Sequence, residues 1–238
     1  MVKKQIKKIL NTIDNKLYKF IIGKPISPPL YTIKRQTIEN YAKEFSIDIF
    51  IETGTFLGET VEALKNKFKK LISIELDKDL YKKSKEKFIY NTHITILQGD
   101  SSDILKVVTP TLYQPTLFWL DGHYSGGITA RGNLNTPILK ELEIILNHRI
   151  KNHIILIDDA RCFTGENEYP TVKELFSFIK KINSNINFKV SNDIIRIVPC
   201  DNIKYIKSKS YKEPFRQKAS FNYRKIKKIL RKIIYAKN

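Results

Sequence analysis

Short apolar segments alternate with helical segments through the middle of the chain. Five segments have the length and apolar character of buried strands, and most are separated by the three- and four-residue spacing of an amphipathic helix. Helical connections between parallel strands are right-handed, and the helices bury both faces of the sheet. The pattern predicts a doubly wound α/β domain. The strand segments are 47–52, 71–76, 94–100, 116–121 and 154–159, and the helical segments are 57–68, 79–88, 134–147 and 171–182.

Segments before and after this pattern complete the predicted domain. A helix is expected over residues 32–45, whereas the connection 101–108 is short and no helix is assigned to it. After the last helix, the segments NFKVS and IIRIVP are separated only by Asn192 and Asp193. Such a short polar link is typical of an antiparallel hairpin. We therefore expect a mostly parallel sheet that ends in a β-hairpin.

The net charge of +19 is concentrated at the two ends of the chain. Residues 1–24 carry seven lysines and one acidic residue (+6), and residues 201–238 carry thirteen basic and two acidic residues (+11). Subtracting 17 from 19 leaves +2 on residues 25–200, so the body is nearly neutral. A domain that binds nucleic acid usually carries a basic patch, so this distribution argues against nucleic acid as its partner.

Both basic ends have the pattern of amphipathic helices. In residues 1–28 and in residues 201–238, isoleucine and leucine recur at helical spacing among lysines. Helices of this kind suit an anionic membrane surface, so we expect peripheral binding at the inner membrane surface. The alternative is that their apolar faces dock on the domain or on a partner subunit of a homo-oligomer. The domain itself is assigned to residues 29–200.

The chain also lacks several signals of export. No apolar run approaches the roughly 18 residues of a membrane span, and the N-terminal segment has no apolar core or cleavage site of a secretory signal. Cys162 and Cys200 are far apart and form no CxxC pair, which indicates neither a disulfide framework nor a zinc site. These features predict a cytoplasmic protein.

Every one of the five predicted strands ends at or beside an acidic residue. The carboxyl ends of parallel strands form one edge of the sheet, where such folds bind ligands. A single acid at a strand end often only caps the next helix. Several together repel one another, which favours a site for cations or ribose hydroxyls. The residues are Glu52, Glu75, Asp100, Asp121 and the pair Asp158–Asp159.

The turn after the first strand is the most specific motif. Its sequence, ETGTFLGET, places Gly54 and Gly58 between a strand and a helix, behind Glu52. These glycines permit a tight turn and close packing of the helix start. Their spacing differs from the GxGxxG of dinucleotide sites, which argues against an NAD oxidoreductase. Glu75 follows roughly 20 residues later, where an acid can hold ribose hydroxyls, and Asp100 lies where it can contact adenine. A generic turn without a ligand is the alternative.

The motifs FIETGTFLGET, LISIELD, ILQGDSSDIL and LFWLDGHYS resemble, in this order, those of class I S-adenosylmethionine-dependent methyltransferases. The resemblance covers residues 30–200 and implies a Rossmann-like, seven-stranded sheet that binds S-adenosylmethionine. It implies that the glycine turn holds the methionine part, Glu75 the ribose and Asp100 the adenine. The implied cofactor-binding residues are Glu52, Thr53, Gly54, Thr55, Gly58, Glu75, Asp100 and Ser101.

The remaining acids, Asp121, Asp158 and Asp159, resemble the carboxylates of metal-dependent O-methyltransferases of the macrocin and catechol types. An all-oxygen site suits Mg²⁺, and the resemblance implies that the ion binds hydroxyls of a sugar or glycan acceptor. A bound divalent ion lowers the pKa of a coordinated oxygen. The alternative is that Asp158 and Asp159 only order the loop that follows them.

His123 is the expected catalytic base, and Asp121 is the alternative. The macrocin type usually has Asp-Gly-Asp where this chain has Asp121-Gly122-His123. His123 could therefore be a base, a metal ligand or a substrate contact, or merely a hydrogen-bonded loop residue. The combined prediction is an O-methyltransferase that acts on a sugar or glycan. An RNA or DNA methyltransferase with basic arms, and a membrane-surface nucleotide-binding protein without activity, remain as alternatives.

Overall fold

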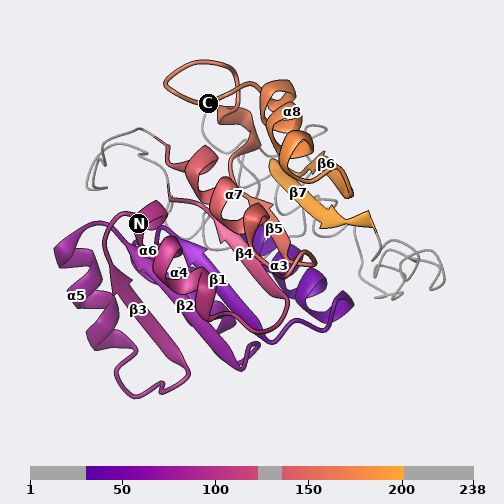
Figure 1. The fold of residues 1–238 in the computed structure, drawn as a ribbon. Helices are drawn as coiled ribbons and strands as arrows, with labels where there is room; N and C mark the ends of the chain where they lie inside the picture. Colours follow the sequence, from indigo (N-terminus) through magenta and orange to yellow (C-terminus); the bar gives the residue numbers. More distant parts are fainter. Residues whose placement is uncertain (1–30, 123–135, 201–238) are drawn as a thin grey trace, which may run out of the picture.

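The computed structural model describes residues 31–122 and 136–200, which form a seven-stranded sheet covered by helices (Figure 1). The strands are β1 (Ile49–Thr53), β2 (Lys70–Glu75), β3 (Ile94–Gln98), β4 (Thr116–Leu120), β5 (Ile154–Ile157), β6 (Ile186–Ser191) and β7 (Ile194–Pro199). Their order is β3-β2-β1-β4-β5-β7-β6. Strands β1 to β5 pair in parallel, and β7 pairs antiparallel with β5 and β6. The predicted sheet is confirmed.

Helices cover both faces of this sheet. They are α3 (Tyr31–Glu44), α4 (Glu59–Leu64), α5 (Lys78–Lys87), α6 (Ser101–Val108), α7 (Ile138–Asn147) and α8 (Val172–Ile182). One core cluster joins α3, α4 and Phe88, at the end of α5, to one face through Phe50 and Trp119. The other joins α6, α7 and α8 to the opposite face through Ile51 and Phe118. Figure 1 shows α5 beside β3 at one end of the sheet and α8 beside the hairpin at the other.

The connection 101–108, to which the sequence pattern assigned no helix, forms α6. The side chain of Asp100 accepts a hydrogen bond from the Ser102 N–H at 2.9 Å and so caps the helix. Leu105 and Val108 then bury one face of it against the sheet. Eight residues are enough for a helix because the cap and the two apolar positions act together.

The terminal hairpin has the turn that its sequence predicted. Asn192 and Asp193 have φ values of +49° and +59°, as the favoured two-residue hairpin turn requires. Asn and Asp tolerate this left-handed conformation better than most residues. The hairpin places β7, with its six buried residues, next to β5.

Three segments lie outside the described residues: 1–30, 123–135 and 201–238. They include both basic ends and His123, so membrane binding, oligomerisation and the role of His123 stay predictions. Of the helices in residues 31–122 and 136–200, none combines the length and apolar character of a membrane span.

A buried histidine pair joins the starts of β4 and β5 to the end of α7. The Thr116 N–H donates to His153 Nδ1 at 3.1 Å, so the ring proton is on Nε2, which lies 2.8 Å from His148 Nδ1. Burial lowers the pKa of His153 to about 4, and the positive charge that His148 can carry acts in the same direction. The fold therefore requires a neutral His153.

We predict that this pair makes stability fall as the pH falls from 6.5 towards 4. His153 of the unfolded chain takes up a proton near pH 6.5, whereas His153 of the folded chain takes up a proton only near pH 4. Protonation of the unfolded chain alone therefore lowers the free energy of unfolding by about 3 kcal/mol over this range. Urea unfolding at pH 7, 5.5 and 4.5 measures this effect. His153→Gln should show a shallower pH dependence than the wild type, and parallel profiles for the two proteins would contradict the assignment.

Candidate functional site

The acids at the carboxyl edge form two groups that meet at Asp121. Burial, helped by the nearby Asp121 and Glu75 carboxylates, raises the pKa of Glu52 to about 8. Burial also raises the pKa of Asp158, and Asp121 and Asp159 add to this shift. Asp121 therefore lies within electrostatic reach of the acids of β1 and β2 on one side and of the acid pair after β5 on the other.

The turn after β1 packs directly against the turn after β4. Gly54 has a φ of +86°, and its N–H donates to the Ile74 carbonyl at 2.9 Å. A Cβ atom at Gly54 would lie 2.5 Å from the Asp121 carbonyl oxygen. Thr53 Oγ1 holds the other side of this contact, since it accepts hydrogen bonds from the N–H groups of Asp121 (3.3 Å) and Gly122 (3.2 Å). Only a glycine allows the two backbones to approach this closely.

Glu75, at the end of β2, fixes the same turn from its other side. Its Oε2 accepts the Phe56 N–H at 2.7 Å, and its Oε1 accepts the Asp77 N–H at 2.9 Å. Burial raises the pKa of Glu75, and these two backbone hydrogen bonds oppose the rise. Each carboxylate oxygen can accept a second hydrogen bond. Glu75 thus keeps the capacity to bind the ribose hydroxyls predicted for it.

A buried polar layer supports the turn from below. Glu52 is only 1% exposed, and the Ser73 hydroxyl donates to it at 2.6 Å. Thr55 Oγ1 lies 2.5 Å from the same Ser73 hydroxyl. Thr60 also hydrogen-bonds to Glu52, and Tyr31 of α3 donates to Thr60 at 3.1 Å. The structure shows Glu52 and Thr55 as supports of the loop, and their contact with a ligand stays a prediction.

Asp100 and Gly58 lie at the two helix starts beside this turn. Asp100 Oδ1 accepts both the N–H and the hydroxyl of Ser102, and in residues 31–122 and 136–200 no hydrogen-bond donor contacts Oδ2. One oxygen thus caps α6 while the other can bind an adenine amino group. Ser101 is the buried first residue of α6. Gly58, with φ of +66°, packs against Phe88, where a Cβ would meet the ring at 2.9 Å.

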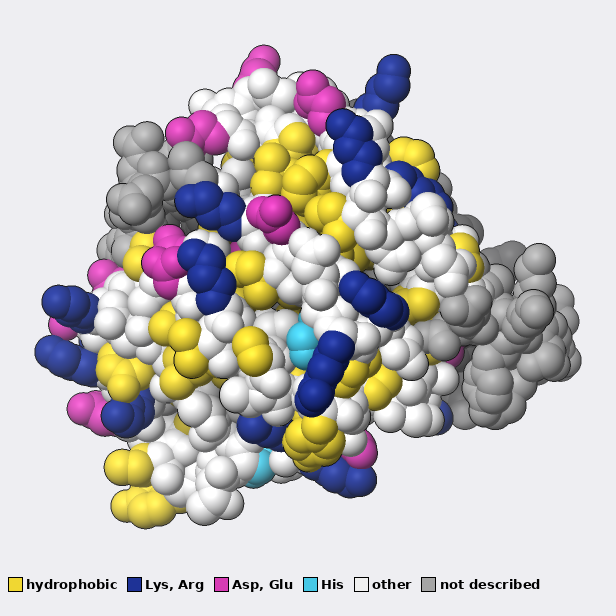
Figure 2. Space-filling view, in the orientation of Figure 1, with side chains coloured by type: hydrophobic (Ala, Val, Ile, Leu, Met, Phe, Trp, Pro, Cys, Tyr) yellow, Lys and Arg dark blue, Asp and Glu magenta, His cyan; other side chains and the backbone are white. Residues whose placement is uncertain are grey.

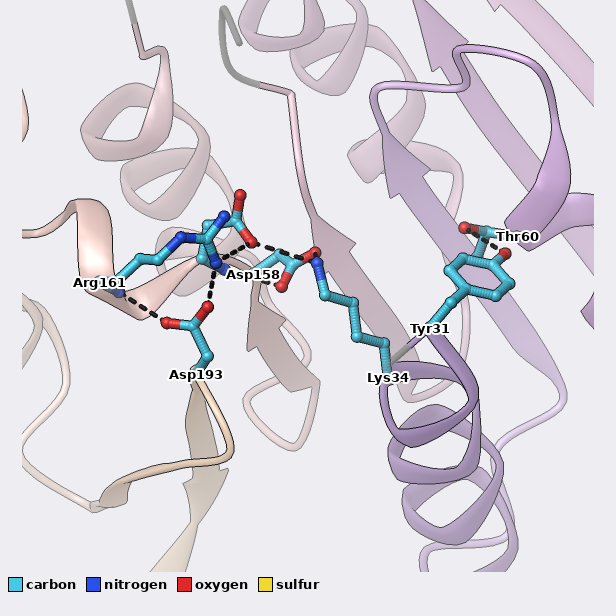
Figure 3. A network of polar contacts seen from close by, with 7 residues as sticks. Tyr31, Lys34, Thr60, Asp158, Arg161 and Asp193 are labelled. Carbon is cyan, nitrogen blue, oxygen red and sulfur yellow. Dashed lines mark hydrogen bonds and ion pairs between the residues drawn. The ribbon is translucent and has the colours of Figure 1, made fainter. Parts of the chain in front are cut away.

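The acid pair after β5 binds two cations of the chain itself (Figure 3). Lys34 of α3 contacts Asp158 Oδ2, and its Nζ lies 3.1 Å from Asp159 Oδ1. Arg161 lies 2.8 Å from the same Asp159 oxygen and also pairs with Asp193 of the hairpin turn. Burial alone would lower the pKa of Lys34, but Asp158 and Asp159 raise it, so the amine stays protonated.

This arrangement does not fit the predicted Mg²⁺ site. Asp158 and Asp159 already bind the Lys34 ammonium, and residues 31–122 and 136–200 contain no cluster of three acidic, histidine or cysteine side chains that could hold a metal. The sequence did not point to Lys34, because it is one of 43 lysines and arginines and lies far from the acids along the chain. Only the packing of α3 beside β4 reveals its partners.

A small pocket lies on the Asp158 side of the edge. Its walls combine apolar side chains of β4, β5 and the following loop with a few polar groups. It is lined in part by Leu120, Gly122, Ile157, Asp158, Phe163 and Tyr169. Gly122, which directly follows Asp121, is therefore part of the wall of this pocket.

Neither a family model nor a curated protein matches this sequence. Solved structures, however, share its fold at low identity. An O-methyltransferase from Bacillus cereus in complex with SAH is 10% identical over 83% of this chain and 100% of its own, with a TM-score of 0.54. The SAH-bound methyltransferase PaMTH1 from Podospora anserina is 14% identical over 83% and 94%, with a TM-score of 0.50.

A third structure is the O-methyltransferase TomG from Streptomyces achromogenes, involved in tomaymycin synthesis and solved in complex with SAM. It is 13% identical over 70% of this chain and 79% of its own, with a TM-score of 0.50. At these identities the likeness concerns the fold. The described domain thus has the Rossmann-like fold of S-adenosylmethionine-dependent methyltransferases.

We predict that Gly54→Ala destabilises the domain more than Gly165→Ala does. Both glycines have similar positive φ values, +86° and +90°, so both variants carry the cost of a left-handed alanine, about 1–2 kcal/mol. At Gly54 the new Cβ also meets the Asp121 backbone, whereas at Gly165 it meets the Thr171 methyl group at 3.0 Å. The clash should add about 1–3 kcal/mol. Equal free energies of unfolding for the two variants would contradict the proposed contact.

Proposed function

We propose that this protein is an S-adenosylmethionine-dependent O-methyltransferase that acts on a hydroxyl group of a sugar or glycan. The observation that carries the proposal is the close contact of the Gly54 turn with Asp121, beside Glu75, at the carboxyl edge of the sheet. This edge belongs to a fold shared with structures solved in complex with SAM or SAH.

The residues of the edge suit S-adenosylmethionine. The turn at Gly54 presents backbone without a side chain, while Glu75 and Asp100 keep oxygens that can accept hydrogen bonds from ribose and adenine. A concentration of acids also favours a positively charged ligand. When bound, the cofactor would supply a methyl group on a cationic sulfur. The chain itself must bind the acceptor and supply a base.

Transfer of a methyl group to a hydroxyl requires a base close to the acceptor oxygen. The oxygen–carbon bond forms as the carbon–sulfur bond breaks, the electron pair of that bond stays on sulfur, and the hydroxyl proton passes to the base. Asp121 lies between the two groups of acids, so its carboxylate can reach an acceptor held there. His123, two positions further along the chain, is the other candidate base.

A hydroxyl-rich acceptor suits the polar groups around Asp158. Asp121 can accept a hydrogen bond from a hydroxyl, and the Lys34 ammonium can donate one. Two of the three structures described above are named O-methyltransferases. The sequence analysis also predicted assistance by Mg²⁺. Because Asp158 and Asp159 already bind Lys34, we propose a reaction without a metal ion.

The face of the domain shown in Figure 2 does not favour nucleic acid as the acceptor. Figure 2 shows lysine and arginine side chains dispersed among acidic and apolar ones on this face, without a single basic patch. Nucleic-acid binding depends on clustered positive charge. We propose that the basic ends, 1–28 and 201–238, serve instead to hold a cytoplasmic enzyme at an anionic membrane surface or in a homo-oligomer.

Calorimetric titration of S-adenosylhomocysteine tests the proposed cofactor. We predict micromolar binding by the wild type and at least tenfold weaker binding by Glu75→Gln, because the amide loses the charge and one acceptor that ribose hydroxyls use. Glu62→Gln, which changes an exposed acid of α4, is the matched control and should bind like the wild type. A wild type that binds no S-adenosylhomocysteine would exclude the proposed function.

A further inference from the structure

We infer that Lys34 takes the place of a divalent cation beside Asp121 and positions the acceptor oxygen there. The role in positioning rests on the proposed methyltransferase function. The replacement of a metal ion by a lysine stands on the contacts of Lys34 alone, so the two parts can be tested separately.

The carboxylates around Lys34 need a compensating positive charge. The Asp158 side chain is fully buried, with 0% exposure, and Asp121 and Asp159 lie close enough to raise its pKa together with burial. Three like charges in one place repel each other strongly when they are removed from water. Lys34 contacts two of these carboxylates and interacts favourably with the third, Asp121. A single ammonium therefore contacts two of the three acids that were predicted to share a metal ion, and it attracts the third.

Arg161 does not fill the same position. Its side chain is 39% exposed against 18% for Lys34, and it divides its contacts between Asp159 and Asp193. Within residues 31–122 and 136–200, Lys34 is the cation that pairs with Asp158. Arg161 thus neutralises the outer side of the acid pair, and Lys34 neutralises the side that faces Asp121.

Helix α3 holds Lys34 firmly in this position. Tyr31, one turn earlier, donates its hydroxyl to Thr60, and Ile38 and Ala42 are buried in the core. Figure 3 shows Lys34 reaching from the helix towards Asp158 while Tyr31 of the same helix points to Thr60. Because the helix is anchored on both sides of Lys34, the ammonium is a fixed part of the edge rather than a surface charge.

The ammonium can also bind an acceptor molecule. It has three N–H donors, and Asp158 and Asp159 accept two of them. No other acceptor contacts Nζ in the described part of the chain. The third N–H can therefore donate to a substrate oxygen near Asp121. A positive charge there stabilises the negative charge that develops on this oxygen as its proton leaves.

The first test is a titration of Mn²⁺ and Mg²⁺ into the full-length wild type, with and without S-adenosylhomocysteine. We expect no saturable heat with either ion up to millimolar concentration and no change of the thermal midpoint with EDTA. Saturable Mn²⁺ binding by the wild type that is lost in Asp158→Asn would overturn the inference. This measurement does not depend on any variant with an altered Lys34.

The second test is Lys34→Met, which keeps the length of the side chain and removes its charge. Without the ammonium, the carboxylates should bind Mn²⁺ at least tenfold more tightly than the wild type does, and Mn²⁺ should raise the thermal midpoint of the variant. Lys69→Met, which breaks an exposed ion pair with Asp48, is the control and should gain no affinity. A folded Lys34→Met protein with wild-type Mn²⁺ affinity would contradict the replacement.

S-adenosylhomocysteine binding, measured on the same samples, separates the two proposals. A wild type that does not bind S-adenosylhomocysteine would count against the methyltransferase function, whatever the metal titrations give. Gain of Mn²⁺ affinity in Lys34→Met supports the replacement of the metal even in that case. Once an acceptor is known, Lys34→Met should raise its KM and lower kcat at least tenfold, and an unchanged KM and kcat would exclude the positioning role.

Discussion

Repulsion among the carboxylates at the end of the parallel strands is the constraint on which the rest of this site depends. The topology brings these acids to one edge, and each is stabilised differently. Glu52 is buried with a pKa raised to about 8 and accepts a hydrogen bond from Ser73. Glu75 accepts two backbone N–H groups, and the Asp158–Asp159 pair receives Lys34 and Arg161. Part of this repulsion is offset by these internal partners, and such a concentration of acids is also typical of a functional site.

Asp121 links the two halves of the edge. On one side, the contact of its backbone with the Gly54 turn fixes it against the groups proposed to bind the cofactor. On the other side, its carboxylate interacts with Lys34 and Asp158, next to the pocket after β5. Methyl transfer needs the acceptor oxygen in line with the methyl group and a base beside that oxygen, and we propose Asp121 for this base because of its position.

The strand and helix periodicity predicted most of the fold, because buried parallel strands and amphipathic helices have different apolar spacing. The hairpin was predicted from the two-residue link Asn192–Asp193, and both residues have the positive φ values that such a turn requires. Helix α6 was not predicted, since it is only eight residues long and its signal is a single cap at Asp100 followed by two buried apolar positions. Element ends differed by a few residues: α7 begins at Ile138, after Pro137, rather than at residue 134.

The candidate site was only partly predictable. Acids at strand ends are visible in the sequence, because strand direction fixes where they lie. The partners of those acids are not visible, since the contact of Lys34 with Asp158 spans 124 positions and depends on the packing of α3. The prediction of a metal triad did not include Lys34, which contacts two of the three acids. The structure also shows contacts of Thr53 with the Asp121 turn and of Thr55 with Ser73, while the binding of the cofactor by these two threonines stays a prediction.

A crystal structure of the full chain soaked with S-adenosylhomocysteine and Mn²⁺ would test the central claim most directly. We predict that the ligand lies along the carboxyl ends of β1, β2 and β4, with its ribose hydroxyls on Glu75 and its sulfur towards Asp121. Lys34 should remain between Asp158 and Asp159, without anomalous scattering from manganese at that place. A ligand bound elsewhere on the domain, or a manganese ion in the position of the Lys34 ammonium, would contradict the account.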